Sequence, residues 1–237
     1  MTTTGTALFN MDLSEVLEEA FERCGSELRS GYDFKTARRS LNLLLIEWGS
    51  RGINLWTVEQ GQIVLNTGVA TYPLPVDTVD LLDHVIRTGS GQNQSDITIS
   101  RISGSTYSTI PNKNALGKPI QVWINRQSGA TTPTGVASPT INVWPTPQSP
   151  GSQYTFIYWR LRRMQDAGDA VNTQDIPFRF LPALIAGLAY YLSMKLPGVD
   201  VQRAQALKMV YDEQFDLAAQ EDREKAPVRM VPRVAFI

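Results

Sequence analysis

The pattern of hydrophobic and polar positions predicts two amphipathic helices at the start of the chain. The first follows Asp12 and Glu15, which form a capping-box pattern, and it ends at Gly25. The second starts at Asp33 and ends at Gly49 and Gly52. Apolar residues recur every three or four positions, at Leu13, Val16, Leu17, Ala20, Phe21 and Cys24, then at Phe34, Ala37, Leu41, Leu44, Leu45 and Trp48. The resulting helical hairpin needs a further partner, because short isolated helices are marginal in water.

Short runs of β-branched and aromatic residues replace the helical spacing from about Leu55 onward. Turn signals separate these runs at Gly61, at 66–68 and at 73–75. The pattern predicts strands at 84–87, 119–126, 140–144 and 154–163. Two stretches rich in glycine, serine and threonine, 88–96 and 128–152, predict exposed loops.

Helical spacing returns at Asp175, with Pro177 suited to the first turn of a helix that ends at Pro197 and Gly198. Asp200 is a candidate N-cap for a last helix, which finishes in a charged run. The apolar positions of this pair are Phe180, Leu181, Leu184, Leu188, Tyr191 and Leu192, then Val201, Ala204, Leu207, Tyr211, Phe215 and Ala218. The last twelve residues hold two prolines and are expected to be extended.

These elements predict an α+β fold with a discontinuous helical bundle, because the apolar stripe of each helix pair finds its simplest partner in the other pair. The bundle comprises residues 12–52 and 175–225. Residues 53–174 form an inserted antiparallel β-rich domain with the loop 128–152. Residues 226–237 form an extended C-terminal tail.

Composition narrows the classes of function. The 237 residues carry 22 basic and 23 acidic side chains, and this near-neutral balance gives no sign of a dedicated polyanion binder. The opening residues lack the basic and apolar regions of a signal peptide, so we expect folding in a cytoplasm. The most apolar run, 181–196, is too short for a membrane span and predicts a buried helix. The single cysteine, Cys24, falls on an apolar helix face and is expected in the core.

Sites for chemistry are not indicated by the sequence. His84 is the only histidine, and it stands in an apolar run where a packed histidine is more common than a general base. No metal-ligand spacing, nucleophile motif or phosphate-binding loop is present. We therefore predict no catalytic residue, no metal and no cofactor.

The segment 154–163 places aromatic and arginine side chains on one strand. Phe156, Tyr158, Arg160 and Arg162 alternate with the residues of the other face. Such a face can bind single-stranded nucleic acid or sugars. We favour the alternative in which one face packs on the sheet and the arginines meet acidic groups of a neighbouring subunit, because no broader basic field is present.

A succession of motifs along the chain resembles a known family. The motifs are Ala37-Arg38-Arg39-Ser40-Leu41-Asn42 running into Trp48-Gly49-Ser50-Arg51-Gly52, then Leu55-Trp56, Tyr72-Pro73-Leu74-Pro75, Ile110-Pro111-Asn112-Lys113, Gly117-Lys118-Pro119, Trp144-Pro145-Thr146-Pro147, Tyr158-Trp159-Arg160-Leu161-Arg162-Arg163, the run 176–184 and Glu221-Asp222-Arg223-Glu224. In this order they resemble the head-to-tail adaptor, or connector, proteins of tailed phages. That superfamily includes the packaged-DNA stabilisation proteins and tail tubular protein A of short-tailed phages.

The resemblance implies a structural protein of the virion, without enzymatic activity. Such adaptors form a ring, usually a dodecamer, that docks under the portal, extends the DNA channel and presents a platform to the tail nozzle. DNA passes through the lumen without being read. The resemblance therefore implies as partners further copies of the chain, the portal protein and tail proteins, with the chain made in the host cytoplasm and located at the head-to-tail interface.

Two groups of residues are candidates for these contacts. We expect the tail to bind the portal, because it is apolar, carries arginines and cannot fold alone. Its candidate residues are Val228, Arg229, Met230, Val231, Arg233, Phe236 and Ile237. Subunit or tail contacts are assigned to Arg160, Arg162, Arg163 and Trp144 in the β-rich domain.

Two other functions remain open from the sequence. One is a different tail completion or nozzle protein of the virion, in which strands form the ring. The other is an enzyme or a glycan-binding module that uses Trp144, Tyr158 and Trp159 as a stacking platform.

Overall fold

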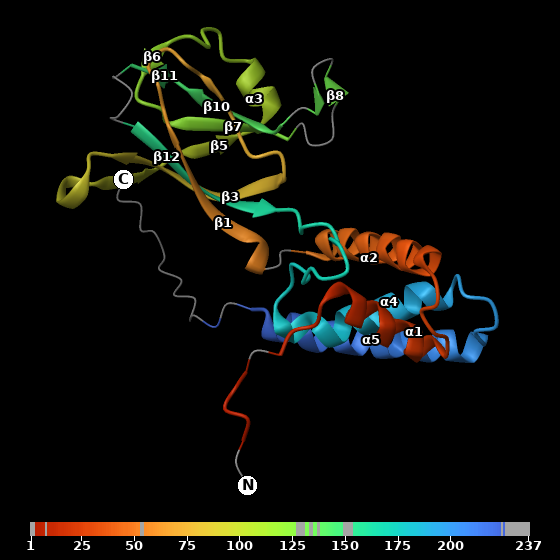
Figure 1. The fold of residues 1–237 in the computed structure, drawn as a ribbon. Helices are drawn as coiled ribbons and strands as arrows, with labels where there is room; N and C mark the ends of the chain where they lie inside the picture. Colours follow the sequence, from red (N-terminus) through yellow and green to blue (C-terminus); the bar gives the residue numbers. More distant parts are fainter. Residues whose placement is uncertain are drawn as a thin grey trace, which may run out of the picture. The chain divides into compact units, whose positions relative to one another are not determined.

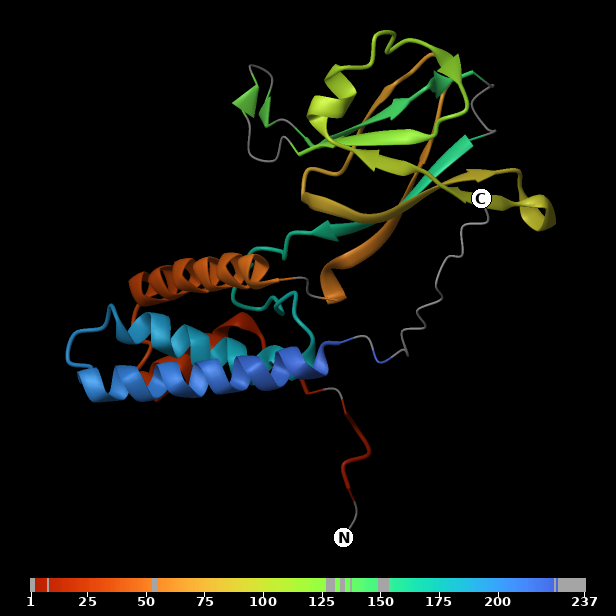
Figure 2. The ribbon, with the colours of Figure 1, turned by 180° about the vertical axis from the view of Figure 1, so that it is seen from behind.

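The computed structural model describes residues 3–7, 9–52, 55–126, 131–132, 135–136, 138–148, 154–223 and 225. The chain divides into two compact units, one formed by 1–55 with 165–237 and the other by 56–164. The first unit is helical and the second is rich in strands (Figures 1 and 2). The predicted α+β class is confirmed.

The two N-terminal helices both begin with a capping box. In α1 (Leu13–Cys24) the Asp12 carboxylate accepts from the Glu15 amide at 2.9 Å, and the Glu15 carboxylate accepts from the Asp12 amide at 3.1 Å. The second helix, α2 (Gly31–Arg51), starts earlier than predicted. Its N-cap is Ser30, and Asp33 is the third helical residue, whose carboxylate closes the box.

The C-terminal helices differ from prediction at their starts. A short 3₁₀ turn, η3 (Phe178–Phe180), follows Pro177, and α4 (Leu181–Ser193) begins only after it, with Pro182 in its first turn. In α5 (Val201–Glu221) Asp200 occupies the N-cap position, but its side chain makes no capping hydrogen bond. The predicted cap is therefore correct in position only.

Aromatic side chains join the two helix pairs. Helix α4 packs against α1, α2 and α5. The fully buried Trp48 of α2 lies 5.5 Å from the Phe180 ring and 5.4 Å from the Phe215 ring of α5. Its indole Nε1 donates to the Tyr211 hydroxyl at 2.8 Å. Each large side chain buried in this way contributes about 1.5–3 kcal/mol before entropy, so the cluster is a main source of the bundle's stability.

The first sheet of the β unit has the strand order β1-β12-β3-β4, with all neighbours antiparallel. Its strands are β1 (Val58–Val64), β3 (Thr78–Thr88), β4 (Ser95–Thr98) and β12 (Tyr154–Arg162). Gly61 lies inside β1 instead of separating two runs as predicted. It pairs with Tyr158, and a Cβ at this position would lie 2.4 Å from the Tyr158 ring, so glycine is required by close packing.

The second sheet has the order β2-β10-β7-β5 and includes one parallel pair, β5 with β7, which the sequence does not predict. Its strands are β2 (Thr71–Pro73), β5 (Ser100–Ile102), β7 (Gln121–Asn125) and β10 (Thr140–Trp144). Shorter elements complete the unit: η1 (Leu55–Thr57), η2 (Gly91–Asn93), α3 (Gly104–Ser108), β6 (Leu116–Gly117) parallel to β11 (Thr146–Pro147), and β8 (Thr131–Thr132) paired with β9 (Gly135–Val136).

Both sheets contribute to one hydrophobic core. The cluster contains Phe156 and Ile86 from the first sheet together with Val122 and Ile141 from the second. The predicted strand 140–144 is confirmed as β10, in which Ile141 is fully buried. The wider prediction of an exposed loop over 128–152 is therefore wrong over β10, and it is also wrong over β11, which pairs with β6. The predicted loop 88–96 likewise runs into β4 at its end.

The segment 165–174, which the sequence places in the insertion, groups with the helices. The Leu13 amide donates to the Asn172 carbonyl oxygen at 2.9 Å. The Ala167 amide donates to the Asn42 side-chain oxygen at 2.7 Å. These hydrogen bonds tie the segment to α1 and α2.

Candidate functional site

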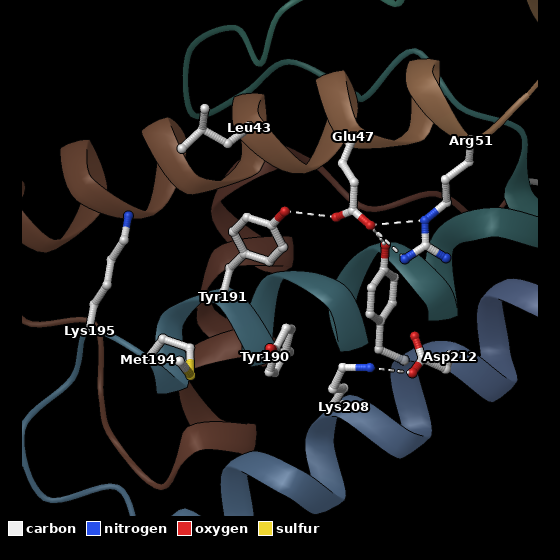
Figure 3. A pocket seen from close by; sticks show the side chains of 10 residues that line it. Leu43, Glu47, Arg51, Tyr190, Tyr191, Met194, Lys195, Lys208 and Asp212 are labelled. Carbon is white, nitrogen blue, oxygen red and sulfur yellow. Dashed lines mark hydrogen bonds and ion pairs between the residues drawn. The ribbon is translucent and has the colours of Figure 1, made fainter.

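The helical unit contains an open pocket between α2, α4 and α5, with a volume of about 560 Å³ (Figure 3). We refer to it as the helical pocket. Ten residues line it: Leu43, Glu47 and Arg51 from α2, Tyr190 and Tyr191 from α4, Met194 and Lys195 just after α4, and Lys208, Tyr211 and Asp212 from α5. The pocket is thus built from both the N-terminal and the C-terminal helices.

Glu47 accepts hydrogen bonds from three other side chains of the helical pocket (Figure 3). One carboxylate oxygen accepts from the Tyr191 hydroxyl at 2.7 Å. The other accepts from Arg51 Nε at 2.9 Å and Nη2 at 2.5 Å, and from the Tyr211 hydroxyl at 3.4 Å. The Arg51 guanidinium also lies over the Phe215 ring, 4.3 Å from its centroid. Both oxygens of Glu47 are therefore held by donors of the same chain.

The tyrosines of this network act as fixed donors. Burial, and then the hydrogen bond to Glu47, raise the pKa of Tyr191 to about 12. Burial and the nearby Glu47 charge also raise the pKa of Tyr211. Both phenols stay protonated at neutral pH, so the arrangement suits rigid support of a surface better than proton transfer.

The rim of the helical pocket combines apolar and charged groups. Leu43 is 48% exposed and Met194 is 69% exposed. The Lys208 ammonium pairs with Asp212 at 2.9 Å. An apolar surface with a polar rim is typical of sites that bind another protein.

Cys24 and His84, whose side chains often take part in catalysis, are packed inside this protein. Cys24 is 4% exposed, its thiol donates to the Ala189 carbonyl oxygen at 3.1 Å, and burial raises its pKa. Its predicted place in the core is confirmed. His84 stacks on Phe156 with ring centroids 5.8 Å apart, and burial lowers its pKa. Among the described residues, no group of three or more His, Cys, Asp or Glu side chains could hold a metal ion. In the same residues, no helix is long and apolar enough to cross a membrane.

The arginines singled out in the sequence lie together in the first sheet. Arg160 Nη1 donates to Asp77 at 2.6 Å, and its Nη2 donates to Glu59 at 2.8 Å. Arg162 Nε donates to the second oxygen of Glu59 at 2.6 Å. The hydrogen bond from Arg160 lowers the pKa of Asp77. The side chains of Arg160 and Arg162 therefore meet the carboxylates of Glu59 and Asp77. Arg163 is joined to Asp77 through the backbone, where its amide donates to the Asp77 carbonyl oxygen at 2.8 Å.

Trp144 lies apart from this cluster, at the end of β10 in the second sheet. Its indole nitrogen donates to the Asn112 carbonyl oxygen at 3.0 Å. Tyr158 is only 4% exposed and stacks on Phe156, so it cannot join Trp144 and Trp159 in a glycan-stacking platform. Contacts of Trp144 and the arginines with another subunit or with the tail stay predictions.

The candidate portal-binding residues 228–231, 233, 236 and 237 lie outside the described residues. The helical pocket, in contrast, is described but was not predicted. Tyr191 and Tyr211 fit the apolar spacing of the helices, and this spacing predicts core positions for both. The available signals were the i,i+4 pair of Glu47 with Arg51 and the adjacent tyrosines Tyr190 and Tyr191 at the end of an apolar helix.

The family model for the SU10 adaptor protein matches residues 11–232 and so spans both units. The chain belongs to the SU10 adaptor protein family. None of the curated proteins matches it. Membership in this phage adaptor family makes the chain a structural component of the virion that associates with other virion proteins. The pocket and the arginine cluster therefore belong to a phage adaptor protein.

Proposed function

We propose that the chain forms the ring that joins the phage head to the tail. The ring docks under the portal, extends the DNA channel and carries the tail. The observation that carries this proposal is the adaptor-family match over 11–232, which includes the helical bundle and the inserted β unit. A dodecamer is the expected ring size, since the sequence resembles adaptors that form such rings.

Charge and architecture support this role. The formal net charge of −1 suits a channel through which DNA moves without being retained, because binding to DNA depends on neutralising phosphates with basic side chains. Two compact units in one chain supply separate surfaces for separate partners. We assign the helical unit to ring and portal contacts, and the β unit to contacts with the tail or an adjacent subunit.

The role is tested by deleting the gene from the phage and imaging the particles by electron microscopy. We expect heads without tails, with tails restored by a plasmid copy of the gene. Complete tailed particles in the deletion strain would contradict the proposal. A location of the chain at the distal end of the tail would instead support the alternative of a tail completion or nozzle protein.

The portal contact is assigned to the C-terminal tail. Truncation after Lys225 removes all of its candidate residues and ends the chain beyond α5, so the described helices are retained. We expect the truncated chain to lose the portal in a pull-down, with an unchanged circular dichroism spectrum. Retained portal binding would contradict the assignment.

The tail contact is assigned to the β unit. A deletion of 128–152 would remove β10, which belongs to the core, so the test is restricted to 128–137. Replacing that segment by a short glycine-serine linker should leave folding intact and impair tail attachment. Normal yields of infectious particles would contradict this assignment.

A further inference from the structure

Helix α2 carries an unpartnered face that is apolar and basic, which we call the basic face. Tyr32, Leu43 and Ile46 are 77%, 48% and 65% exposed. Lys35 and Arg39 are also exposed and lie between them. These five positions follow one another in steps of three or four residues, so they occupy one side of the helix. Neither cation forms an ion pair with another described residue.

Helix α5 carries an unpartnered face that is apolar and acidic, which we call the acidic face. Met209, Val210 and Leu217 are 74%, 41% and 55% exposed. The exposed carboxylates of Glu213 and Asp216 lie among them at helical spacing. Neither of these carboxylates forms an ion pair within the part of the chain that the structure describes.

Exposed apolar surface is unequal among the four helices. In α1 and α4, which are described over their full lengths, no large hydrophobic side chain is exposed. The outer side of α1 is polar, with Glu18 and Glu22 exposed. Contiguous exposed apolar positions mark interaction sites more reliably than charge alone. This selects the faces of α2 and α5.

Apart from Leu43, which also lines the helical pocket beside α5, the two faces lie on different sides of the bundle. Both helices pack on α4, which lies between them in Figures 1 and 2. The inner side of α5 contacts α2 through Tyr211, whereas Met209 and Glu213 lie on the opposite side of α5. Two different, complementary patches on opposite sides of a subunit are what a head-to-tail interface requires.

We propose that the basic face of α2 binds the acidic face of α5 in the next copy of this chain, and that this contact closes the ring. The inference rests on the proposed ring and specifies which surfaces form it. Opposite charges provide orientation and partner choice, and the apolar side chains provide the buried area. A two-fold pairing of α2 with α2 is disfavoured because it would bring like charges together.

The area buried between the two faces determines which assay can detect the contact. A helix of 21 residues is about 31 Å long and about 10 Å across, so each face covers roughly 300 Å². The pair would bury roughly 600 Å², below the approximately 1,000 Å² of a stable isolated complex. Assembly should therefore be measured in phage particles, where the portal gathers the copies.

The test uses two double variants in a phage that lacks the gene, supplied from plasmids. Lys35→Glu/Arg39→Glu makes both faces acidic, and Glu213→Lys/Asp216→Lys makes both faces basic. Each variant alone places like charges across every contact, and we expect its incorporation into particles to fall about tenfold or more. Because every contact between one variant and the other is again between opposite charges, co-expression of the two should restore incorporation. A chain with all four substitutions should restore it as well.

The control is Glu18→Lys/Glu22→Lys on α1, which reverses two exposed acidic residues outside both faces. We expect this variant to enter particles as the wild type does. Circular dichroism of each purified variant shows whether it folds, and rescue by co-expression excludes misfolding as the cause of the loss.

The outcomes separate this inference from the proposed function. Wild-type incorporation of either face variant alone, or loss without rescue in the mixture, would overturn the α2–α5 contact while leaving the adaptor ring in place. If the wild-type chain itself does not enter particles at the head-to-tail junction, the proposed function fails first.

Discussion

The hydrogen bond between Trp48 and Tyr211 provides a quantitative test of how the two helix pairs are joined. Trp48 is fully buried and Tyr211 is 2% exposed, with 2.8 Å between the indole nitrogen and the hydroxyl oxygen. Tyr211→Phe removes the acceptor and leaves the indole N–H buried without a partner. An orphaned buried donor costs about 1–3 kcal/mol, so we expect the free energy of unfolding to fall by about that amount.

Trp48→Phe acts differently on the same contact. The Tyr211 hydroxyl keeps Glu47 as an acceptor, at 3.4 Å, while the smaller ring leaves space beside Phe180 and Phe215. The loss of packing should cost about 2–3 kcal/mol. In the Tyr211→Phe background the same substitution also removes the orphaned donor. It should therefore cost about 1–2 kcal/mol less than in the wild type.

The assay is urea unfolding followed by far-UV circular dichroism, a signal dominated by the helices. The matched control is Tyr190→Phe, because the Tyr190 hydroxyl makes no hydrogen bond to another described residue. It should change stability by less than about 0.5 kcal/mol. Additive effects of Trp48→Phe and Tyr211→Phe, within about 0.5 kcal/mol, would refute the buried-donor reasoning.

Three further predictions concern glycine packing, pH and the arginine cluster. Gly61→Ala should destabilise the β unit by about 1–3 kcal/mol, since the new Cβ would meet the Tyr158 ring, whereas Gly31→Ala, where nothing lies within 4 Å, should be nearly neutral in thermal melts. The pKa of Tyr191 rises from 10.0 in the unfolded chain to about 12 in the folded chain. The contribution of the protonated Tyr191 hydroxyl to the free energy of unfolding is therefore complete below pH 10 and should be lost between pH 10 and 12. Urea titrations should show a smaller alkaline loss in Tyr191→Phe. Arg160→Lys should cost about 1–2 kcal/mol in urea unfolding, because one ammonium cannot hold two carboxylates on opposite sides; unchanged stability would indicate that the pairs are solvated.

The helices and long strands could be predicted from the sequence because their signals are local. Asp12, Glu15 and Gly25 mark the ends of α1 within one turn of it, and the structure confirms them. The start of α2 was placed late because Asp33 also fits an N-cap, and only the position of Ser30 distinguishes the two. The parallel pairing of β5 with β7 could not be predicted, because it depends on a crossover connection that no short motif specifies.

The candidate sites were less predictable than the fold, because a side chain can bind a partner only if the folded chain leaves it exposed, and residue type does not determine exposure. The sequence predicts Arg160 and Arg162 to be surface groups available to a partner. In the structure they form ion pairs with Asp77 and Glu59, which are distant in the sequence. The apolar spacing predicts Tyr191 and Tyr211 to be core residues. In the structure their hydroxyls donate to Glu47 in the helical pocket. Both differences arise from tertiary pairing, which hydrophobic spacing does not encode.

The near-zero net charge of the chain conceals a directional arrangement of charge. In the proposed ring, a single-signed surface on every copy would make neighbours repel each other, and it would also retain or repel DNA in the proposed channel. Placing cations on the outer side of α2 and carboxylates on the outer side of α5 keeps the sum near zero while making each copy complementary to the next. Composition cannot distinguish this arrangement from randomly mixed charge. The face variants can, because each variant alone should enter particles about tenfold less or lower, and the two expressed together should enter normally.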